Sequence, residues 1–213
     1  MTNSEFYDYI LKRVRRDGDT VVRADVILEV TRLMQSWEKG SFHPWFLETV
    51  ASGLVTVADT QTISEPTDYG LLIEDTDVFV VDEDGDDNTL ERGYHENLEN
   101  KYANEDAGLP KTYDFFGGLI YFGPVPDAVY TIKLKYYANS TVPPDDNDPV
   151  TNPWVLNAED YCITAAAERI VRYYLKNSKL AGELKLDLAL LRKELFNYSE
   201  SRKHVDMNYE VDS

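Results

Sequence analysis

Residues 119–137 decide how the chain folds, and they read Leu119-Ile120-Tyr121-Phe122-Gly123-Pro124-Val125-Pro126-Asp127-Ala128-Val129-Tyr130-Thr131-Ile132-Lys133-Leu134-Lys135-Tyr136-Tyr137. Two runs rich in β-branched and aromatic residues flank a turn sequence with two prolines. Because proline fixes φ and has no amide N–H, the backbone turns or leaves the strand ladder there. After the turn, apolar residues fall on every second position, which predicts a half-buried antiparallel strand. The stretch as a whole therefore predicts a hairpin.

Length and composition limit the classes of protein that the chain can belong to. It has 213 residues, 43% of them hydrophobic, which is enough to build the core of one substantial domain or two small ones. Asp and Glu number 39 against 21 Lys and Arg, so the formal net charge is −18. This charge argues against binding DNA phosphates, or an anionic membrane, through a general basic surface. It fits either a surface past which nucleic acid slides, or an acidic surface that only keeps the protein soluble.

Cellular location is constrained by the single cysteine and by the apolar runs. Cys162 has no partner for an intrachain disulfide, and it lies in an apolar helical run as a small buried side chain. No apolar run approaches the ~20 residues that a membrane span requires. The first residues lack the basic and apolar regions of a signal peptide. We expect a protein made and assembled in a cytoplasm, with no membrane partner.

Helical periodicity is found at both ends of the chain. Helices are predicted at residues 4–16, 20–38, 158–177 and 179–197, with Ser4 and Asn157 as N-caps of the first and third. The last helix carries a leucine stripe at positions 184, 188, 191 and 195. Residues 198–213 lack such a pattern and predict an extended C-terminal tail.

The middle of the chain has the composition of strands. Strand segments are predicted at 45–50, 53–57, 70–81, 113–116, 119–122 and 129–137, with an acidic turn at 82–88 and a short polar helix at 90–102. The last three strands should complete an antiparallel meander. The fold class is therefore α+β. We expect residues 1–40 and 154–197 to form one helical bundle, residues 41–140 an inserted β-sheet domain, and residues 141–153 a linker.

A calcium loop is one alternative interpretation of the acidic turn. With Gly85 in the sixth position of an EF-hand loop, Asp82, Asp84 and Glu91 occupy ligand positions. The first position would be Val80, which cannot bind a cation, and the preceding residues predict a strand rather than a helix. We therefore prefer an acidic β-turn and expect no metal site.

Signals of other chemistry are weak. His43, His95 and His204 are far apart and lack metal-ligand spacing, and Cys162 has no basic neighbour that would activate it. Neither a nucleophile-elbow motif nor a phosphate-binding loop occurs. The many carboxylates leave a hydrolase possible, but nothing in the sequence identifies a catalytic pair. We expect no catalytic residue and no cofactor.

The order of these segments resembles the head-to-tail adaptor, or connector, proteins of tailed bacteriophages, in particular those of short-tailed phages. The resemblance extends from about residue 5 to residue 197. It rests on the following segments: Val22-Arg23-Ala24-Asp25-Val26, Trp45-Phe46-Leu47-Glu48, Thr56-Val57-Ala58-Asp59-Thr60-Gln61, Pro66-Thr67-Asp68-Tyr69-Gly70-Leu71-Leu72, Gly123-Pro124-Val125-Pro126-Asp127 with its strand, and Trp154-Val155-Leu156 before an alanine-rich helix. Glu65 and the long acidic turn at 82–88 depart from the family pattern.

The resemblance implies a non-enzymatic structural protein of the virion neck. It implies a homo-oligomeric ring of about twelve copies, a dodecamer, seated between the portal protein and the tail nozzle or tail-tube protein. Genomic DNA would pass through the lumen without sequence-specific binding. The C-terminal segment would contact the portal, with Val205, Met207, Tyr209 and Val211 as portal-binding anchors. Another neck or stopper protein, or a cell-wall hydrolase, is the alternative.

Overall fold

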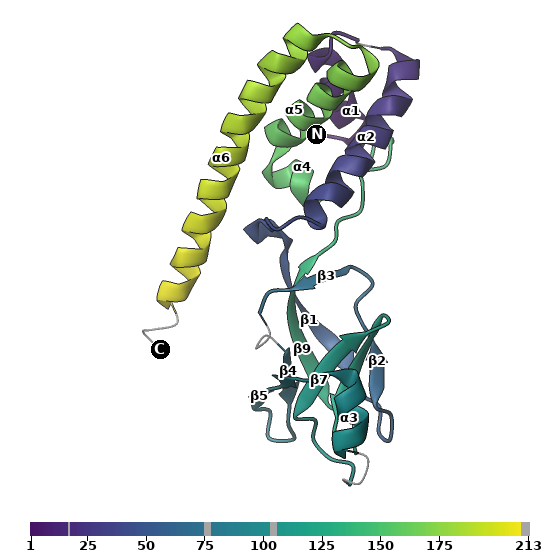
Figure 1. Ribbon diagram of the computed structural model, residues 1–213, viewed down its shortest axis with the longest axis vertical. Coiled ribbons are helices and arrows are strands. Elements are labelled where there is room, and N and C mark those ends of the chain that lie inside the picture. Colours follow the sequence, from purple (N-terminus) through teal and green to yellow (C-terminus); the bar gives the residue numbers. More distant parts are fainter. Residues whose placement is uncertain (17, 75–77, 103–105, 210–213) are drawn as a thin grey trace. The chain divides into compact units, whose positions relative to one another are not determined.

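The computed structural model describes residues 1–16, 18–74, 78–102 and 106–209 (Figure 1). The chain divides into two compact units. The helical unit comprises Met1–Leu47 and Ser140–Ser213, and the β unit comprises Glu48–Asn139. The predicted α+β class is confirmed, since the N-terminal and C-terminal helices pack together and the strands are inserted between them.

The two N-terminal helices begin at well-formed caps. Helix α1 spans Asn3–Arg13, and a capping box joins Thr2 and Glu5 at its start. The predicted cap at Ser4 is wrong, because the N-cap is Thr2, two residues earlier. Helix α2 spans Thr20–Glu38, as predicted, because the Asp19 carboxylate accepts hydrogen bonds from two first-turn amides.

The third predicted helix is divided in the structure. Helix α4 spans Pro153–Asn157 and is capped by Asn152, whereas α5 spans Glu159–Arg169 and has no side-chain cap. The chain then continues as a π-helical turn, η2, at Ile170–Tyr174. The predicted cap at Asn157 is wrong, because its side-chain amide instead donates to the carbonyl of Pro153.

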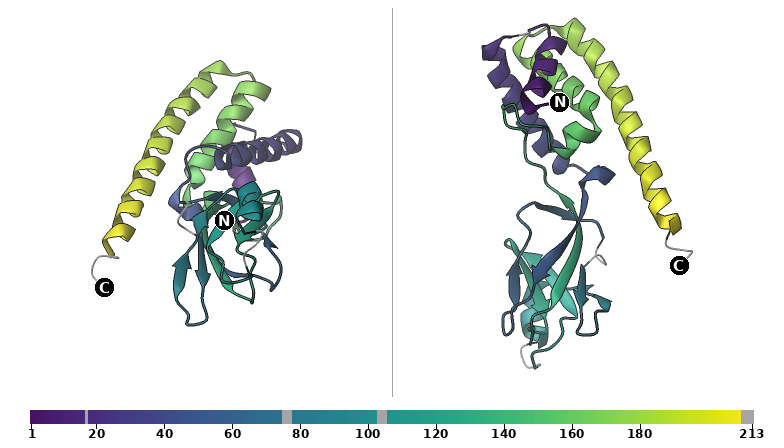
Figure 2. Two further views of the ribbon diagram at one scale, coloured as in Figure 1. Left: turned by 60° about the horizontal axis from the view of Figure 1, so that its bottom comes forward. Right: turned by 180° about the vertical axis from the view of Figure 1, so that it is seen from behind.

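Helix α6 spans Ser178–Tyr209 and runs antiparallel to α5 (Figure 2). Its predicted leucine stripe faces inward, with Leu184 and Leu195 buried. The predicted end at residue 197 is wrong, and residues 198–209 are helical rather than an extended tail. Two causes explain the continuation: the sequence has no proline or glycine after Gly182, and the 3₁₀ turn η1, Trp45–Leu47, packs against this part of the helix.

The segment before α4, predicted as a linker, lies along α1 and α2. Thr2 forms an isolated bridge with Pro149, and the buried Tyr7 hydroxyl donates to the Pro143 carbonyl at 2.5 Å. Arg23 of α2 binds Asp145 through two hydrogen bonds of 2.6 and 2.7 Å. The segment is therefore an integral part of the helical unit.

The β unit contains two sheets rather than one meander. In the first, the strands follow the order β1 (Glu48–Val55), β9 (Thr131–Ala138), β4 (Val78–Val81), β5 (Asp87–Thr89), with β3 (Tyr69–Leu72) also on β9. In the second, the order is β2 (Thr62–Ser64), β8 (Leu119–Gly123), β7 (Thr112–Phe116), β6 (Glu91–Arg92). Among the strands of the described residues, only β6 and β7 pair in parallel.

The predicted hairpin of residues 119–137 is therefore wrong, because β8 and β9 belong to different sheets. Pro124 and Pro126 have no amide N–H for a ladder, so the chain leaves one sheet and enters the other. The alternation in β9 was predicted correctly: Ile132, Leu134 and Tyr136 are buried. The segment 45–57, predicted as two strands, forms η1 and the single strand β1.

Side chains from both sheets share one core. Its members include Val78, Val80, Tyr113, Ile120, Phe122, Ile132 and Leu134. The predicted polar helix begins later than expected, because residues 91–92 form β6 and α3 spans only His95–Tyr102. Tyr102 packs so closely on β8 that a Cβ at Gly123 would lie 2.4 Å from its ring, so only glycine fits there. None of the helices in the described ranges is long and apolar enough to cross a bilayer.

Candidate interaction surfaces of the helical unit

Charge is divided unequally between the two units. The β unit has 19 Asp and Glu against five Lys and Arg, a net charge of −14. The helical unit has 20 against 16, a net charge of −4. Copies of the helical unit can therefore approach one another with far less electrostatic repulsion than copies of the β unit.

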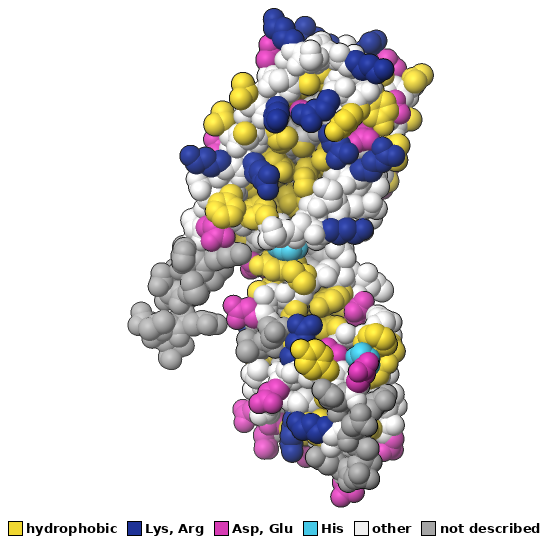
Figure 3. All heavy atoms as spheres, viewed as in Figure 1, with side chains coloured by type: hydrophobic (Ala, Val, Ile, Leu, Met, Phe, Trp, Pro, Cys, Tyr) yellow, Lys and Arg dark blue, Asp and Glu magenta, His cyan; other side chains and the backbone are white. Residues whose placement is uncertain are grey.

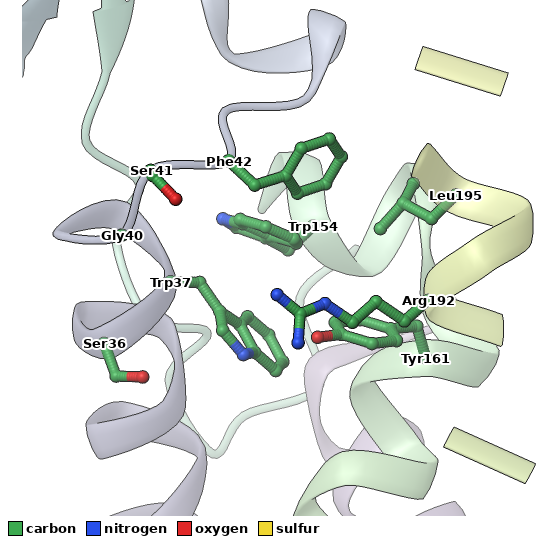
Figure 4. Close-up of a pocket in the computed structure, with 9 residues that line it drawn as sticks. All are labelled: Ser36, Trp37, Gly40, Ser41, Phe42, Trp154, Tyr161, Arg192 and Leu195. Atoms are coloured by element: carbon green, nitrogen blue, oxygen red, sulfur yellow. The ribbon is translucent and has the colours of Figure 1, made fainter. Parts of the chain in front are cut away.

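An aromatic pocket opens on the helical unit where α2, α4, α5 and α6 meet (Figure 4). Its volume is about 350 Å³. The ring centre of Trp37 lies 4.8 Å from that of Trp154 and 5.0 Å from that of Tyr161. Arg192 extends from α6 toward Trp37. Burial raises the pKa of Tyr161, although the positive charge of Arg192 acts in the opposite direction.

Two hydrogen-bond donors of this pocket lack an acceptor. Trp154 is only 1% exposed, and no described residue accepts the hydrogen of its indole Nε1. In Figure 4, this edge of the ring lies on the side of Ser41. Arg192, in turn, forms no ion pair with any carboxylate in the described ranges. Arg192 is exposed, so a carboxylate from outside the chain can reach its guanidinium and pair with it.

A second depression of about 260 Å³ adjoins this pocket and shares Trp37 and Tyr161 with it. We call the combined surface the arginine–aromatic face, and it comprises Trp37, Tyr161, Arg169, Arg172, Tyr173 and Arg192. Over the helices, Figure 3 shows a strip of hydrophobic side chains bordered by Lys and Arg.

The buried carboxylate of Glu29 holds the helices beneath this face in place. Glu29 is 2% exposed, and its oxygens lie 2.6 Å from Arg32 Nη1 and 2.7 Å from Arg169 Nε. The hydroxyl of Tyr174 donates to the same carboxylate at 3.2 Å. Arg172 pairs with Glu168 one turn away. The network joins α2 to the π-helical turn, so the orientation of Arg169 and Tyr174 is set from within the core.

The other side of α6 carries the opposite charge. A shallow depression of about 320 Å³ is lined there by Asp160, Asp187, Leu190 and Glu194, which we call the acidic face. Arg13 of α1 also lines it and pairs with Asp187 at 3.2 Å. Leu190 remains 64% exposed. The helical unit thus presents a cationic, aromatic surface on one side of α6 and an acidic, aliphatic surface on the other.

Portal-binding residues were predicted in the C-terminal segment. Val205, Met207 and Tyr209 lie in the last turns of α6, but their side chains lie outside the described residues, as does Val211 entirely. Their role in binding is taken up again as a proposal below.

The acidic turn after β4 is organised by one carboxylate. Asp82 Oδ1 accepts from the amides of Asp86 and Asp84 at 2.9 and 3.1 Å, and Oδ2 accepts from the Asn88 side chain at 2.8 Å. These bonds, that from Asp86 first, lower the pKa of Asp82. The residues before the turn form a strand, as predicted. The arrangement is that of an acidic turn between β4 and β5. Across the described ranges, no three metal-ligating side chains gather.

The cysteine and the histidines were the other residues considered for chemistry. Cys162 is buried, and burial raises the pKa of its thiol. The ring of His95 stacks on Phe116 and contacts Asp114, while His43 lies 3.2 Å from the Glu38 carbonyl. The side chain of His204 lies outside the described residues.

Two pairs of adjacent tyrosines differ in exposure. Tyr136 and Tyr137 are both buried, whereas Tyr173 and Tyr174 are 57% and 37% exposed.

Both faces of the helical unit were missed from the sequence. A signal was available on α6, where Lys185 and Arg192 are seven residues apart, and so are Asp187 and Glu194. Seven residues are about two turns, so each pair shares a face. The aromatic pocket has no such signal, because its rings come from helices far apart in the sequence.

The sequence was compared with known families and proteins. The family model described as SU10 adaptor protein matches residues 7–202, which is most of the chain. No curated protein matches the chain.

Proposed function

The chain belongs to the SU10 adaptor protein family of phage head-to-tail adaptors, and from that premise we propose that it forms a ring between the portal and the tail of a bacteriophage virion. The observation that carries the proposal is the match over residues 7–202, which includes both units. The protein acts as a structural adaptor and not as an enzyme.

The two units have different roles in this proposal. The helical unit, nearly balanced in charge, builds the wall of a ring of about twelve copies. The β unit faces the tail nozzle or the tail-tube protein. The C-terminal end, with Val205, Met207, Tyr209 and Val211, contacts the portal. This assignment is supported by the charge division, because like-charged β units cannot pack tightly against one another without a partner of opposite charge.

The ring also serves as a conduit for genomic DNA. Each copy has a formal net charge of −18, and a ring multiplies that charge. Acidic groups that line a lumen repel the phosphates, so DNA passes without adhering to the wall. We expect replacement of lumen carboxylates by lysine to slow DNA ejection. Ejection at an unchanged rate would contradict the role of these carboxylates.

Deletion of the gene from its phage tests the function directly. We expect DNA-filled heads without tails in electron micrographs, and restored tailed particles when the chain is supplied from a plasmid. A map of the wild-type particle should then show the protein between the portal and the tail. Normal tailed particles after deletion would overturn the proposal, and density elsewhere in the neck would favour a stopper protein. Digestion of peptidoglycan by the purified chain would favour a hydrolase.

A further inference from the structure

We propose that the arginine–aromatic face of one copy binds the acidic face of the next copy, with Arg192 paired to Glu194 across the interface. The inference rests on the proposed ring and deepens it, because it names the surfaces through which copies of the chain meet. A ring requires two different, complementary patches on each copy, since a head-to-tail contact uses one patch of each neighbour.

The two patches lie on different sides of one helix. On α6, Arg192 and Glu194 are separated by two positions, which is about 200° around the helix axis. Arg192 lines the aromatic pocket, whereas Glu194 lines the depression on the other side with Asp160 and Leu190. The two residues therefore cannot pair within one copy, but both are available to two different neighbours.

The chemistry of the two patches is complementary. The aromatic pocket offers the guanidinium of Arg192, which is exposed and forms no ion pair among the described residues. The acidic face offers carboxylate acceptors, because Asp160 and Glu194 form no ion pair in the described ranges. It also offers the exposed Leu190 to the aromatic rings. Pairing therefore supplies a carboxylate to the guanidinium of Arg192 and removes apolar surface from water.

The balance of charge in the helical unit favours a second copy as the occupant. With 20 acidic and 16 basic residues, two helical units meet with little net repulsion. The β unit, at −14, would place much more repulsion at any contact between copies. Contacts between copies are thus assigned to the helical unit.

Charge reversal of the full-length chain tests the pairing. Sedimentation velocity over a wide range of protein concentration, without any other phage protein, measures self-association of the wild type, Arg192→Glu and Glu194→Arg. We expect the wild type to associate and each reversal to weaken association at least tenfold. Lys193→Glu is the matched control, because it makes the same charge change on the neighbouring residue of α6. It should associate as the wild type does, and circular dichroism should show all variants folded.

An equimolar mixture of the two reversals gives the decisive result. In the mixture, the unchanged Arg192 of one variant can pair with the unchanged Glu194 of the other. The two substituted residues also meet with opposite charges, so the mixture should associate as the wild type does. Failure of the mixture to associate, a reversal without effect, or a wild type that remains monomeric would each overturn the pairing. Those results leave the gene-deletion phenotype unaffected, so failure of this inference is distinguishable from failure of the proposed function.

Discussion

The backbone amide of Trp45 donates a hydrogen bond to the hydroxyl of Ser199, 3.0 Å away. The two residues are 154 positions apart in the sequence, and the bond joins η1 to the part of α6 beyond residue 197. Arg202, one turn further, places its guanidinium carbon 4.0 Å from the Trp45 ring centre. These contacts explain why the helix continues where the apolar periodicity ends.

Ser199→Ala should destabilise the helical unit by about 1 kcal/mol. Ser199 is completely buried, so its loss leaves the Trp45 amide without that acceptor, and the better helix propensity of alanine offsets part of the cost. The measurement is urea unfolding followed by tryptophan fluorescence, because Trp37, Trp45 and Trp154 all belong to the helical unit.

Ser201→Ala serves as the control for this variant. Its hydroxyl is exposed and donates only to the carbonyl of Tyr198 in the same helix. Its unfolding free energy should stay within about 0.5 kcal/mol of the wild type. Equal effects of the two substitutions would contradict the importance of the bond between η1 and α6.

Arg23→Lys should cost about 1–2 kcal/mol although it preserves the charge. Arg23 binds Asp145 with both arms of its guanidinium, and it also binds Asp8 at 2.5 Å. The hydrogen bonds that Arg23 donates to these carboxylates, the one to Asp145 first, raise its pKa. Lysine cannot reproduce the planar fork, so the segment before α4 loses part of its attachment to α2.

Arg16→Lys is the matched comparison, because Arg16 is 52% exposed and lies 3.9 Å from Asp19. Its unfolding midpoint in urea should not change. If Arg23→Lys unfolded at the same urea concentration as Arg16→Lys, the planar geometry of the Arg23 guanidinium would contribute nothing to stability.

Local signals in the sequence located the helices, though not all of their ends, but they did not separate the two sheets. Helix α2 has its predicted bounds, because its apolar stripe is regular and Gly40 follows its end. The two sheets were not separated, because strand pairing joins residues far apart: β1 pairs with β9, and Glu48 lies opposite Tyr137. Alternation shows which side chains of β9 are buried, but it carries no information on which strand lies beside it.

The candidate surfaces depended on tertiary structure in the same way. Spacing of seven on α6 would have revealed that Lys185 and Arg192 share one face and that Asp187 and Glu194 share another. The pocket itself requires Trp37 of α2 to meet Trp154 of α4, and no sequence period links these residues.

Alkaline pH should weaken the helical unit through Tyr7. Burial, and then the negative charge of Asp145, raises the pKa of Tyr7 from 10.0 to about 12. Between these values the folded chain retains the phenol proton while the unfolded chain loses it. The contribution to stability is therefore complete below pH 10 and declines as the pH rises to 12, by at most about 1.4 kcal/mol per pH unit.

Tyr7→Phe should flatten this decline, because phenylalanine has no proton to lose. Urea unfolding followed by circular dichroism at pH 7, 10 and 11 would measure it. The variant should be less stable at pH 7, since it lacks the bond to Pro143, and the difference from the wild type should shrink above pH 10. If the unfolding free energy of the wild type and of the variant fell equally above pH 10, Tyr7 would be excluded as the cause of the decline.

Two truncations of α6 should separate folding from portal binding. A chain that ends at Arg202 keeps the contacts of Ser199 and Arg202 with Trp45, so its unfolding free energy should stay within about 0.5 kcal/mol of the full chain. A chain that ends at Asn197 loses both contacts and should be less stable by about 2 kcal/mol. Both lack Val205, Met207, Tyr209 and Val211, so in our proposal neither joins particles that carry the portal. Co-sedimentation with such particles measures binding, and a chain ending at Arg202 that co-sediments as well as the full chain would remove these four residues from the portal contact.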